Sequence, residues 1–361
     1  MNNKAIIAMS GGVDSSVSAY LIKEQGFEGI GVTMKLFEND DIGINRENSC
    51  CSLSDVEDAR SVAFKLGIPY YVFNFTTDFK SQVIERFINA YENGATPNPC
   101  IDCNRYLKFD KLYARAKELG CDYIVTGHYA RIEYSEKYHR YLLKKAIDNT
   151  KDQSYVLYSM TQQQLAHTIF PLGELLKTQT RAIAEANVFV NAKKHDSQDI
   201  CFVPDGDYAK FIENYTGKKY QSGNFIDRHG NIIGEHKGIT RYTVGQRKGL
   251  GIAASKPMYV CSICKESNTV MLGDSYDLFS KSLDATGFNW ISIENPAPPL
   301  RVKAKVRYKQ NEQWATVTQI LPDKVHIEFE EPQSAIANGQ AVVLYDDDIV
   351  VGGGTIIASY H

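Results

Sequence analysis

A segment near the N-terminus has the composition of a loop that binds phosphate. It reads Ser10-Gly11-Gly12-Val13-Asp14-Ser15-Ser16, and it stands between an apolar run at residues 5–9 and a run with helical spacing. Glycines let the backbone approach a phosphate, and the N–H groups of a helix N-terminus attract the anion. The serine hydroxyls add donors, and the Asp14 carboxylate suits a magnesium ion that bridges phosphates. The simpler alternative is a glycine turn with a serine N-cap.

This loop differs from the commonest phosphate-binding motif. No Gly-Lys-Ser/Thr follows the glycines, so the segment is not a Walker A loop. Transfer of a γ-phosphoryl group is therefore not implied. The segment resembles the SGGxDS loop of the ATP pyrophosphatases, which hold the pyrophosphate as it leaves and transfer AMP to a substrate.

Cysteines mark a second segment with chemical potential. Cys100 and Cys103 lie in Thr96-Pro97-Asn98-Pro99-Cys100-Ile101-Asp102-Cys103-Asn104, where two prolines fix an extended loop. Helical spacing follows, at residues 105–119. A helix N-terminus lowers the pKa of a thiol, so Cys103 is predicted to be a reactive thiolate. Cys201 stands between a polar loop and two apolar residues, and alone it would be assigned to the core.

A zinc site is an alternative use of these cysteines. Cys261 and Cys264 form a second Cys-x-x-Cys pair, which together with Cys100 and Cys103 would supply four zinc ligands. The gap between the two pairs is far longer than in common zinc ribbons. Both later cysteines also lie in a strand-like run where buried cysteines are unremarkable.

Positive charge alternates along one segment near the C-terminus. On a strand the cations of this segment would all face one side: Arg301, Lys303, Lys305, Arg307 and Lys309. Such a stripe fits RNA phosphates, and the alternative is a charged barrel edge that resists aggregation. A second cationic group is expected in the glycine-rich middle of the chain: His236, Lys237, Arg241, Arg247 and Lys248. With a net charge of −3, any RNA surface must be local.

The elements that must position these residues alternate in the first half of the chain. Strands are expected at residues 5–9, 29–35, 70–75 and 123–126, and helices at 16–25, 56–66, 79–92 and 105–119. This alternation predicts an α/β fold with a doubly wound parallel sheet. The loops at the carboxyl ends of such strands form the binding crevice.

The second half of the chain predicts different architecture. A hairpin is expected at residues 134–144 and a helix at 181–188. Strands at 302–308, 313–320, 324–329, 340–345 and 350–359 are spaced as in a small β-barrel. A chain of 361 residues is too long for one core. We predict a nucleotide-binding domain at 1–205, a small middle domain at 206–280 and a C-terminal β-barrel at 281–361.

Bulk properties suggest a cytoplasmic protein. No apolar run approaches the ~20 residues of a membrane span, and the N-terminus lacks the apolar core and cleavage site of a signal peptide. The eight cysteines do not belong to a small secreted disulfide scaffold.

Over nearly its whole length the sequence resembles the tRNA-specific 2-thiouridylases of the ATP pyrophosphatase superfamily. The matching segments are residues 10–15, 98–104, 126–129, 151–155, 170–173, 197–202 and 245–251. The resemblance implies that ATP adenylates the wobble uridine of tRNAs for lysine, glutamate and glutamine, and that sulfur then replaces the activated oxygen. It implies that Cys103 is the catalytic nucleophile and that Cys201 carries the sulfur as a persulfide, loaded by a cysteine desulfurase or a sulfur carrier. The two cysteines would form a disulfide during turnover.

The resemblance also assigns binding residues. For ATP with magnesium they are Ala8, Met9, Ser10, Gly11, Gly12, Val13, Asp14, Ser15, Met34 and Gly127. For the anticodon stem-loop of tRNA they are Asn98, Pro99, Cys100, His128, Lys151, Asp152, Gln153, Arg307, Tyr308 and Gln340. Asn98 and Pro99 would border a flipped base, because chemistry at a base edge requires the base to leave the stack. Met34 also fits a core position, and His128 also fits a polar residue that closes a strand.

Cys100 departs from part of the family, in which some members have an aspartate at this position. No general acid or base is therefore assigned there. The three cysteines Cys100, Cys103 and Cys201 suggest a further alternative, an iron–sulfur cluster as in some other tRNA-thiolating enzymes. Two other classes of function compete: a ligase-type ATP pyrophosphatase that acts on a small molecule, and a non-catalytic RNA-binding module with a structural metal. The first needs no paired cysteines, and the second leaves residues 10–16 without a purpose.

Overall fold

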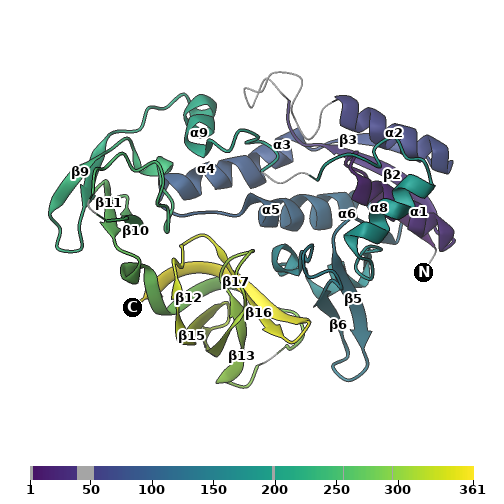
Figure 1. The fold of residues 1–361 in the computed structure, drawn as a ribbon. Coiled ribbons are helices and arrows are strands. Elements are labelled where there is room, and N and C mark those ends of the chain that lie inside the picture. Colours follow the sequence, from purple (N-terminus) through teal and green to yellow (C-terminus); the bar gives the residue numbers. More distant parts are fainter. Residues whose placement is uncertain (1–2, 39–52, 197–199, 255, 295) are drawn as a thin grey trace.

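A parallel sheet forms the centre of the first domain. The computed structural model describes residues 3–38, 53–196, 200–254, 256–294 and 296–361. The strands run in the order β3-β2-β1-β4-β7, with bounds β1 Lys4–Ala8, β2 Glu28–Lys35, β3 Tyr70–Asn74, β4 Tyr123–Val125 and β7 Thr168–Ile169. All four pairings are parallel. Figure 1 shows this sheet with helices on both sides.

Alternate residues of β1 enter different cores, which is why the strand is apolar throughout. Ala5 and Ile7 belong to one buried cluster and Ile6 to another. Helices α1 (Val13–Glu24), α2 (Leu53–Leu66) and α8 (Lys177–Ala186) contribute to the first cluster. The predicted doubly wound fold is confirmed.

Two nearly continuous helices cover the other face. One consists of α3 (Thr76–Phe79), the π-helical segment η2 (Lys80–Ile84) and α4 (Glu85–Glu92), and the other of α5 (Pro99–Asp102), η3 (Cys103–Lys111) and α6 (Leu112–Glu118). Together with α9 (Tyr208–Thr216) they surround an aromatic cluster. The helix that the sequence predicts at residues 105–119 thus begins six residues earlier, at Pro99.

The middle part of the chain forms a separate small sheet. Its order is β10-β11-β8-β9, with bounds β8 Gly223–Ile226, β9 Ile232–His236, β10 Tyr259–Cys264 and β11 Thr269–Gly273. Short 3-10 turns flank it at η5 (Ile239–Arg241) and η6 (Tyr276–Leu278). Figure 1 shows this sheet on the far left, beyond α4 and α9.

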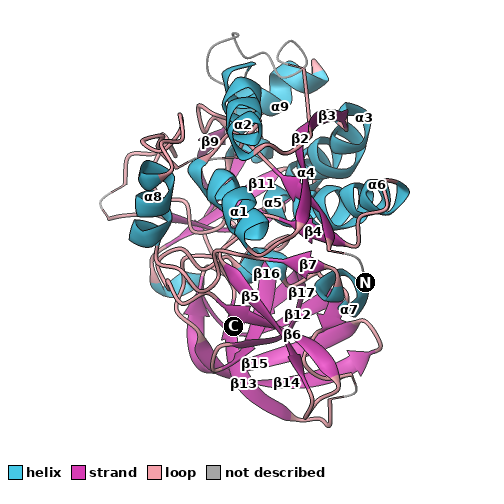
Figure 2. Cartoon of the chain, turned by 90° about the vertical axis from the view of Figure 1, so that its right-hand side faces the viewer, coloured by secondary structure: helices cyan, strands magenta, loops and turns pink. Residues whose placement is uncertain are grey.

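The C-terminal strands close into a barrel in the order β12-β15-β14-β13-β16-β17, because β12 pairs with both β15 and β17. Their bounds are β12 Phe279–Trp290, β13 Leu300–Lys305, β14 Gln313–Leu321, β15 Lys324–Ser334, β16 Ala341–Asp346 and β17 Ile349–Tyr360. The barrel is confirmed, but β12 was not predicted. Figure 2 shows it below the helical part of the molecule.

A hairpin of the first domain extends the barrel sheet. Strands β5 (Ala130–Ser135) and β6 (Arg140–Lys145) form the hairpin, and Lys144 of β6 lies in register with Ile349 of β17. The short segments η4 (Ser154–Leu157) and α7 (Gln162–Ala166) follow it. No helix within the described ranges is long and apolar enough to cross a membrane.

Candidate active site

The phosphate loop is a tight turn between β1 and α1. Gly11 has φ +75°, and a Cβ on it would lie 2.4 Å from the carbonyl oxygen of Asp55, so only glycine fits there. The Ser10 N–H donates to Ser15 Oγ (3.2 Å), and the Ser15 and Ser16 hydroxyls each donate to the Gly12 carbonyl (3.0 Å). Both hydroxyls therefore fix the loop itself.

The strand order brings a second loop against this one. Strand β4 lies directly beside β1, so residues 126–128 follow β4 at the same edge as the phosphate loop. A Cβ on Gly127 would lie 2.9 Å from the backbone of Asp14 and Ser15. The close approach that requires a glycine at 127 is thus made by the phosphate loop, at the point where ligands bind in such sheets.

The residues predicted at the nucleoside end divide between the two faces of the sheet. Met9 is buried, its N–H donates to the Val32 carbonyl (2.8 Å) and its carbonyl accepts from the Thr33 hydroxyl (2.6 Å). Ala8 and Met34 are partly buried against the aromatic cluster on the opposite face. Val13 is buried in α1.

Cys103 lies inside a helix and not at its beginning. Asn98 is the N-cap of α5, where its side chain accepts from the Cys100 N–H (3.2 Å), and Pro99 follows it. Cys103 is therefore one turn further on and is buried. Burial raises the pKa of the Cys103 thiol to about 11, although the nearby charge of Lys108 opposes the rise. The predicted resting thiolate is wrong: desolvation outweighs the helix terminus.

This raised pKa predicts the reactivity of Cys103 towards iodoacetamide. Only the thiolate reacts, and below the pKa its fraction rises about tenfold per pH unit. Alkylation of Cys103 should therefore be slow at pH 7 and still rising steeply at pH 9.5, as measured by mass spectrometry of the peptide. The exposed Cys264 in the same digest is the reference for reagent activity. A Cys103 rate that levels off below pH 8 would contradict the burial argument.

Cys201 borders the cluster that contains Cys103. Cys103 is a buried member of this aromatic cluster, and Cys201 is partly buried against it. The next residue, Phe202, is buried between the rings of Phe87 and Phe211, at 5.3 and 5.2 Å between centroids. Residues 197–199 of the same motif lie outside the described residues. Two thiols that are 98 positions apart in sequence (103 and 201) thus share one core with Ala8 and Met34.

The metal alternatives for the cysteines are not supported. Within the described ranges, which include Cys100, Cys103, Cys201, Cys261 and Cys264, no three His, Cys, Asp or Glu side chains are placed to hold a metal ion. None of these five cysteines forms a disulfide bond. Neither the four-cysteine zinc site nor the three-cysteine cluster is assembled in this structure.

The residues predicted to contact tRNA beside the phosphate loop are mostly engaged. His128 is buried, its Nδ1 lies 2.6 Å from the Thr126 hydroxyl, and burial holds its pKa well below the usual value. The Asp152 carboxylate accepts from the Ser154 hydroxyl (2.8 Å), and the Gln153 side chain accepts from the Tyr129 N–H (3.0 Å). The side chains of Asp152 and Gln153 therefore stabilise the loop between β6 and η4.

Two of the three barrel residues predicted to contact tRNA bond to other parts of the chain, and the third, Arg307, bonds within the barrel domain. The Gln340 amide donates to the Thr96 carbonyl (2.8 Å), on the loop that leads to Cys100 and Cys103. The Tyr308 hydroxyl donates to the Asp152 carbonyl (2.9 Å), and Arg307 donates to the Ala335 carbonyl. The sequence did not predict that Gln340 and Tyr308 would join the barrel to the loops that contain Thr96 and Asp152.

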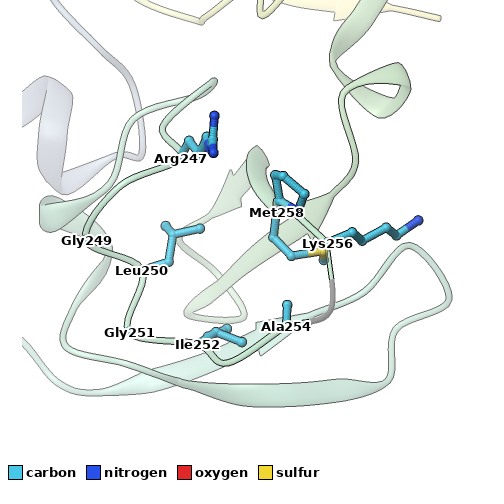
Figure 3. Close-up of a pocket in the computed structure, with 9 residues that line it drawn as sticks. Arg247, Gly249, Leu250, Gly251, Ile252, Ala254, Lys256 and Met258 are labelled. Carbon is cyan, nitrogen blue, oxygen red and sulfur yellow. The ribbon is translucent and has the colours of Figure 1, made fainter.

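The predicted cationic surfaces are only partly formed. Strand β13 ends at Lys305, so Arg307 and Lys309 do not continue its face, and the stripe of five cations is wrong. In the middle domain, His236 is buried and Arg241 pairs with Glu213 at 2.6 Å. Arg247 is exposed and lines a cavity of about 410 Å³ together with Leu250, Ile252 and Met258 (Figure 3).

Comparison with known proteins identifies the family. Family models described as a tRNA methyl transferase HUP domain, a tRNA methyl transferase PRC-barrel domain and an aminomethyltransferase beta-barrel domain match residues 3–205, 209–274 and 280–356. The tRNA-specific 2-thiouridylase MnmA of Clostridioides difficile is 54% identical over 356 residues, which cover 99% of this chain and 98% of that protein. The chain belongs to the tRNA-specific 2-thiouridylase family. The protein of the same name from Acetivibrio thermocellus is 53% identical over 98% of this chain and 99% of its own.

This member of the family contains site residues that sequence reasoning missed. A segment that runs from α8 to Asp196 encloses the phosphate loop: Lys177 Nζ lies 2.7 Å from Asp14 Oδ1, and the Asn191 amide donates to the Gly11 carbonyl (2.9 Å). Lys194 Nζ pairs with Asp55 at 2.6 Å. No local motif marks these residues, because each acts on partners far away in the sequence.

Proposed function

We propose that this protein adenylates the wobble uridine of the tRNAs for lysine, glutamate and glutamine and replaces its 2-oxygen with sulfur. The observation that carries the proposal is the shared cluster. Ala8 and Met34, which we assign to the nucleoside of ATP, border the same aromatic cluster that contains Cys103 and that Cys201 packs against. This shared cluster supports a reaction in which the base is activated and sulfur is delivered on the same side of the sheet. The curated relatives are named as tRNA-specific 2-thiouridylases, which supports the same reaction.

The activation step uses ATP. The uracil 2-oxygen takes the adenylyl group, and pyrophosphate leaves, which converts a poor leaving group into AMP. The turn at Gly11 and the N-terminus of α1 are suited to the phosphates. The Asp14 carboxylate is half-exposed and fits a magnesium ion, which would neutralise the phosphates when bound. Asp14 would hold this ion, and the N–H groups of the loop would orient the departing pyrophosphate.

The sulfur comes from a persulfide on Cys201. In one order of events, Cys103 attacks the inner sulfur of the persulfide, releases hydrosulfide to attack carbon 2, and forms a disulfide with Cys201. In the other, the terminal sulfur attacks carbon 2 first and displaces AMP, and Cys103 then cleaves the adduct to form the same disulfide. Both orders need an external thiol reductant to restore the two cysteines. A cysteine desulfurase or a sulfur carrier in the cytoplasm would load Cys201.

The raised pKa of Cys103 bears on both orders. A thiol whose pKa is about 11 is protonated at pH 7, so Cys103 must lose its proton in the complex with tRNA. Lys108 already favours the thiolate, and a substrate that rearranges this site would strengthen that effect. The nucleophile would then form only when the activated base is present, which protects the persulfide from wasteful release.

The anticodon stem-loop would bind where the barrel meets the cysteine loop. Asn98, Pro99 and Cys100 begin the helix that carries Cys103, and Gln340 bonds to the residue two positions before Asn98. The Tyr308 hydroxyl forms a second link from the barrel domain, because it donates to the Asp152 carbonyl. Exposed Cys100 and the part-exposed Tyr308 ring are accessible to a splayed nucleotide. Residues of both domains would thus hold the target base.

Reconstitution tests the function. Protein, ATP, magnesium, a reductant, a cysteine desulfurase with cysteine and unmodified lysine tRNA are incubated, and the digested nucleosides are analysed by mass. The expected product is 2-thiouridine at the wobble position, formed only with ATP. Pyrophosphate release with a small-molecule acceptor and no thiolated base would favour the ligase-type ATP pyrophosphatase instead.

A further inference from the structure

Lys177 is held at the phosphate loop by two carboxylates. Its ammonium lies 2.7 and 2.8 Å from the two oxygens of Asp14 and 2.8 Å from Asp196 Oδ1. Only 11% of its side chain is exposed. Lys177 is the first residue of α8, and its N–H donates to Asp148 Oδ2 at 2.9 Å. The position of the ammonium is therefore fixed from both the backbone and the side chain.

Three cationic side chains surround the carboxylate of Asp196. Lys151, Lys177 and Arg181 lie 2.7, 2.8 and 2.9 Å from its carboxylate. Although burial opposes the effect, Lys151 and Lys177 lower the pKa of Asp196 to about 2. Lys151, Lys177 and Arg181 form ion pairs with two carboxylates, Asp14 and Asp196, while a third carboxylate, Asp148, accepts hydrogen bonds from the Lys177 N–H and the Thr150 hydroxyl. The arrangement has positive charge available for an anion that reaches the loop.

We propose that Lys177 binds the phosphates of ATP, and that its ion pair with Asp14 is the nucleotide-free form of this site. Asp14 would hold magnesium when the ion is bound, and the Lys177 ammonium, still paired with Asp196, would pair with the phosphates in place of Asp14. A lysine ammonium is a compact point charge that suits phosphate. The proposal rests on the proposed function, since it takes ATP to be the ligand of this loop.

The surroundings of Lys177 are already arranged for this exchange. The Tyr129 hydroxyl donates to Asp14 Oδ1 (2.9 Å), so Asp14 keeps one neutral partner when Lys177 leaves it. The Lys177 ammonium also lies 5.7 Å from the centre of the Tyr129 ring. Donors fixed where negative charge develops stabilise a leaving group without reorganisation, and pyrophosphate gains charge as it departs. Lys177 should therefore affect catalysis as well as binding.

A purely structural ion pair is the competing explanation, and a pair of variants separates the two. Asp14→Asn removes the carboxylate that Lys177 neutralises, and Asp14→Asn with Lys177→Met removes both charges. If Lys177 only neutralises Asp14, both proteins should bind ATP equally. If it binds phosphate, the double variant should bind ATP at least about tenfold more weakly than Asp14→Asn. The double variant leaves no unpaired charge between these two residues, so it is also the variant best able to fold.

The measurement is calorimetric titration with ATP in the presence of EDTA, so that magnesium does not contribute. Lys177→Met alone should in addition slow tRNA-dependent pyrophosphate release about 10²-fold or more, because one donor to the leaving group is lost, and Lys177→Arg should restore part of it. Lys65→Met is the matched control, because Lys65 donates to the Val188 carbonyl (3.0 Å) just after α8. This variant should bind ATP as wild type does. Equal affinities of the double variant and Asp14→Asn would overturn the proposal. Wild-type protein that binds no ATP in a parallel titration with magnesium would instead overturn the proposed function.

Discussion

Cys103→Ser is expected to lower the formation of 2-thiouridine at least about 10³-fold while ATP binding stays within about twofold of wild type. A serine hydroxyl cannot attack a persulfide to form a disulfide, so both orders of sulfur transfer stop at the same point. ATP binding should survive because residues 10–16, which form the phosphate loop, lie in α1 and in the connection that precedes it, and not in the helix that carries Cys103. The measurement is nucleoside mass analysis of tRNA alongside titration with ATP.

Cys201→Ser should abolish thiolation to the same extent when a desulfurase is the sulfur source. Cys264→Ser is the matched control: Cys264 is exposed at the end of β10, in the middle domain, and its loss should leave the rate unchanged. Retention of desulfurase-driven thiolation in Cys201→Ser would remove Cys201 from the persulfide role. The same retention in Cys103→Ser would remove the nucleophile and with it the assignment of the reaction to this pair.

The sequence predicted the elements whose signals are local. A glycine pair after an apolar strand marks the phosphate loop, and alternation of strands and helices gives a parallel sheet. Strand β12 was missed because polar residues and bulges interrupt its pattern: its register shifts between Ser280 and Ser282 and again between Asp284 and Ala285. The predicted stripe of cations was too long, because cationic residues continue to alternate in the sequence after Lys305 whereas strand β13 ends there.

The chemistry of the site depends on contacts that no local pattern encodes. Asp14 and Lys177 are 163 residues apart, so neither signals the other. The helix that carries Cys103 suggested a lowered thiol pKa, but the direction is set by burial, which is a property of the folded chain. In the same way, Gln340 and Tyr308 were assigned to tRNA by resemblance, and only the fold places them against the loops that lead to Cys103 and Asp152.

One side chain, Phe202, holds the Cys201 segment in place. Phe202→Ala is expected to destabilise the nucleotide-binding domain by about 3–5 kcal/mol, the usual cost of removing a buried phenylalanine. The ring is 1% exposed, and its centroid lies 5.6 Å from that of Phe79 and 5.2 Å from that of Phe211. The Phe202 ring therefore packs against residues of both α3 and α9, directly after Cys201 in the sequence. Urea denaturation, followed by the midpoint and slope of the transition, measures the change.

Phe64→Ala is the control for this substitution, because Phe64 is 87% exposed on α2 and should change stability by less than about 0.5 kcal/mol. Phe202→Leu should recover part of the stability, since it restores apolar volume. At temperatures where Phe202→Ala is still folded, its thiolation rate should fall more than its ATP affinity, because Phe202 directly follows Cys201 whereas residues 10–16 lie outside this cluster. If Phe202→Ala were as stable as Phe64→Ala, or lost ATP affinity and thiolation equally, the aromatic cluster would not be what aligns the two cysteines.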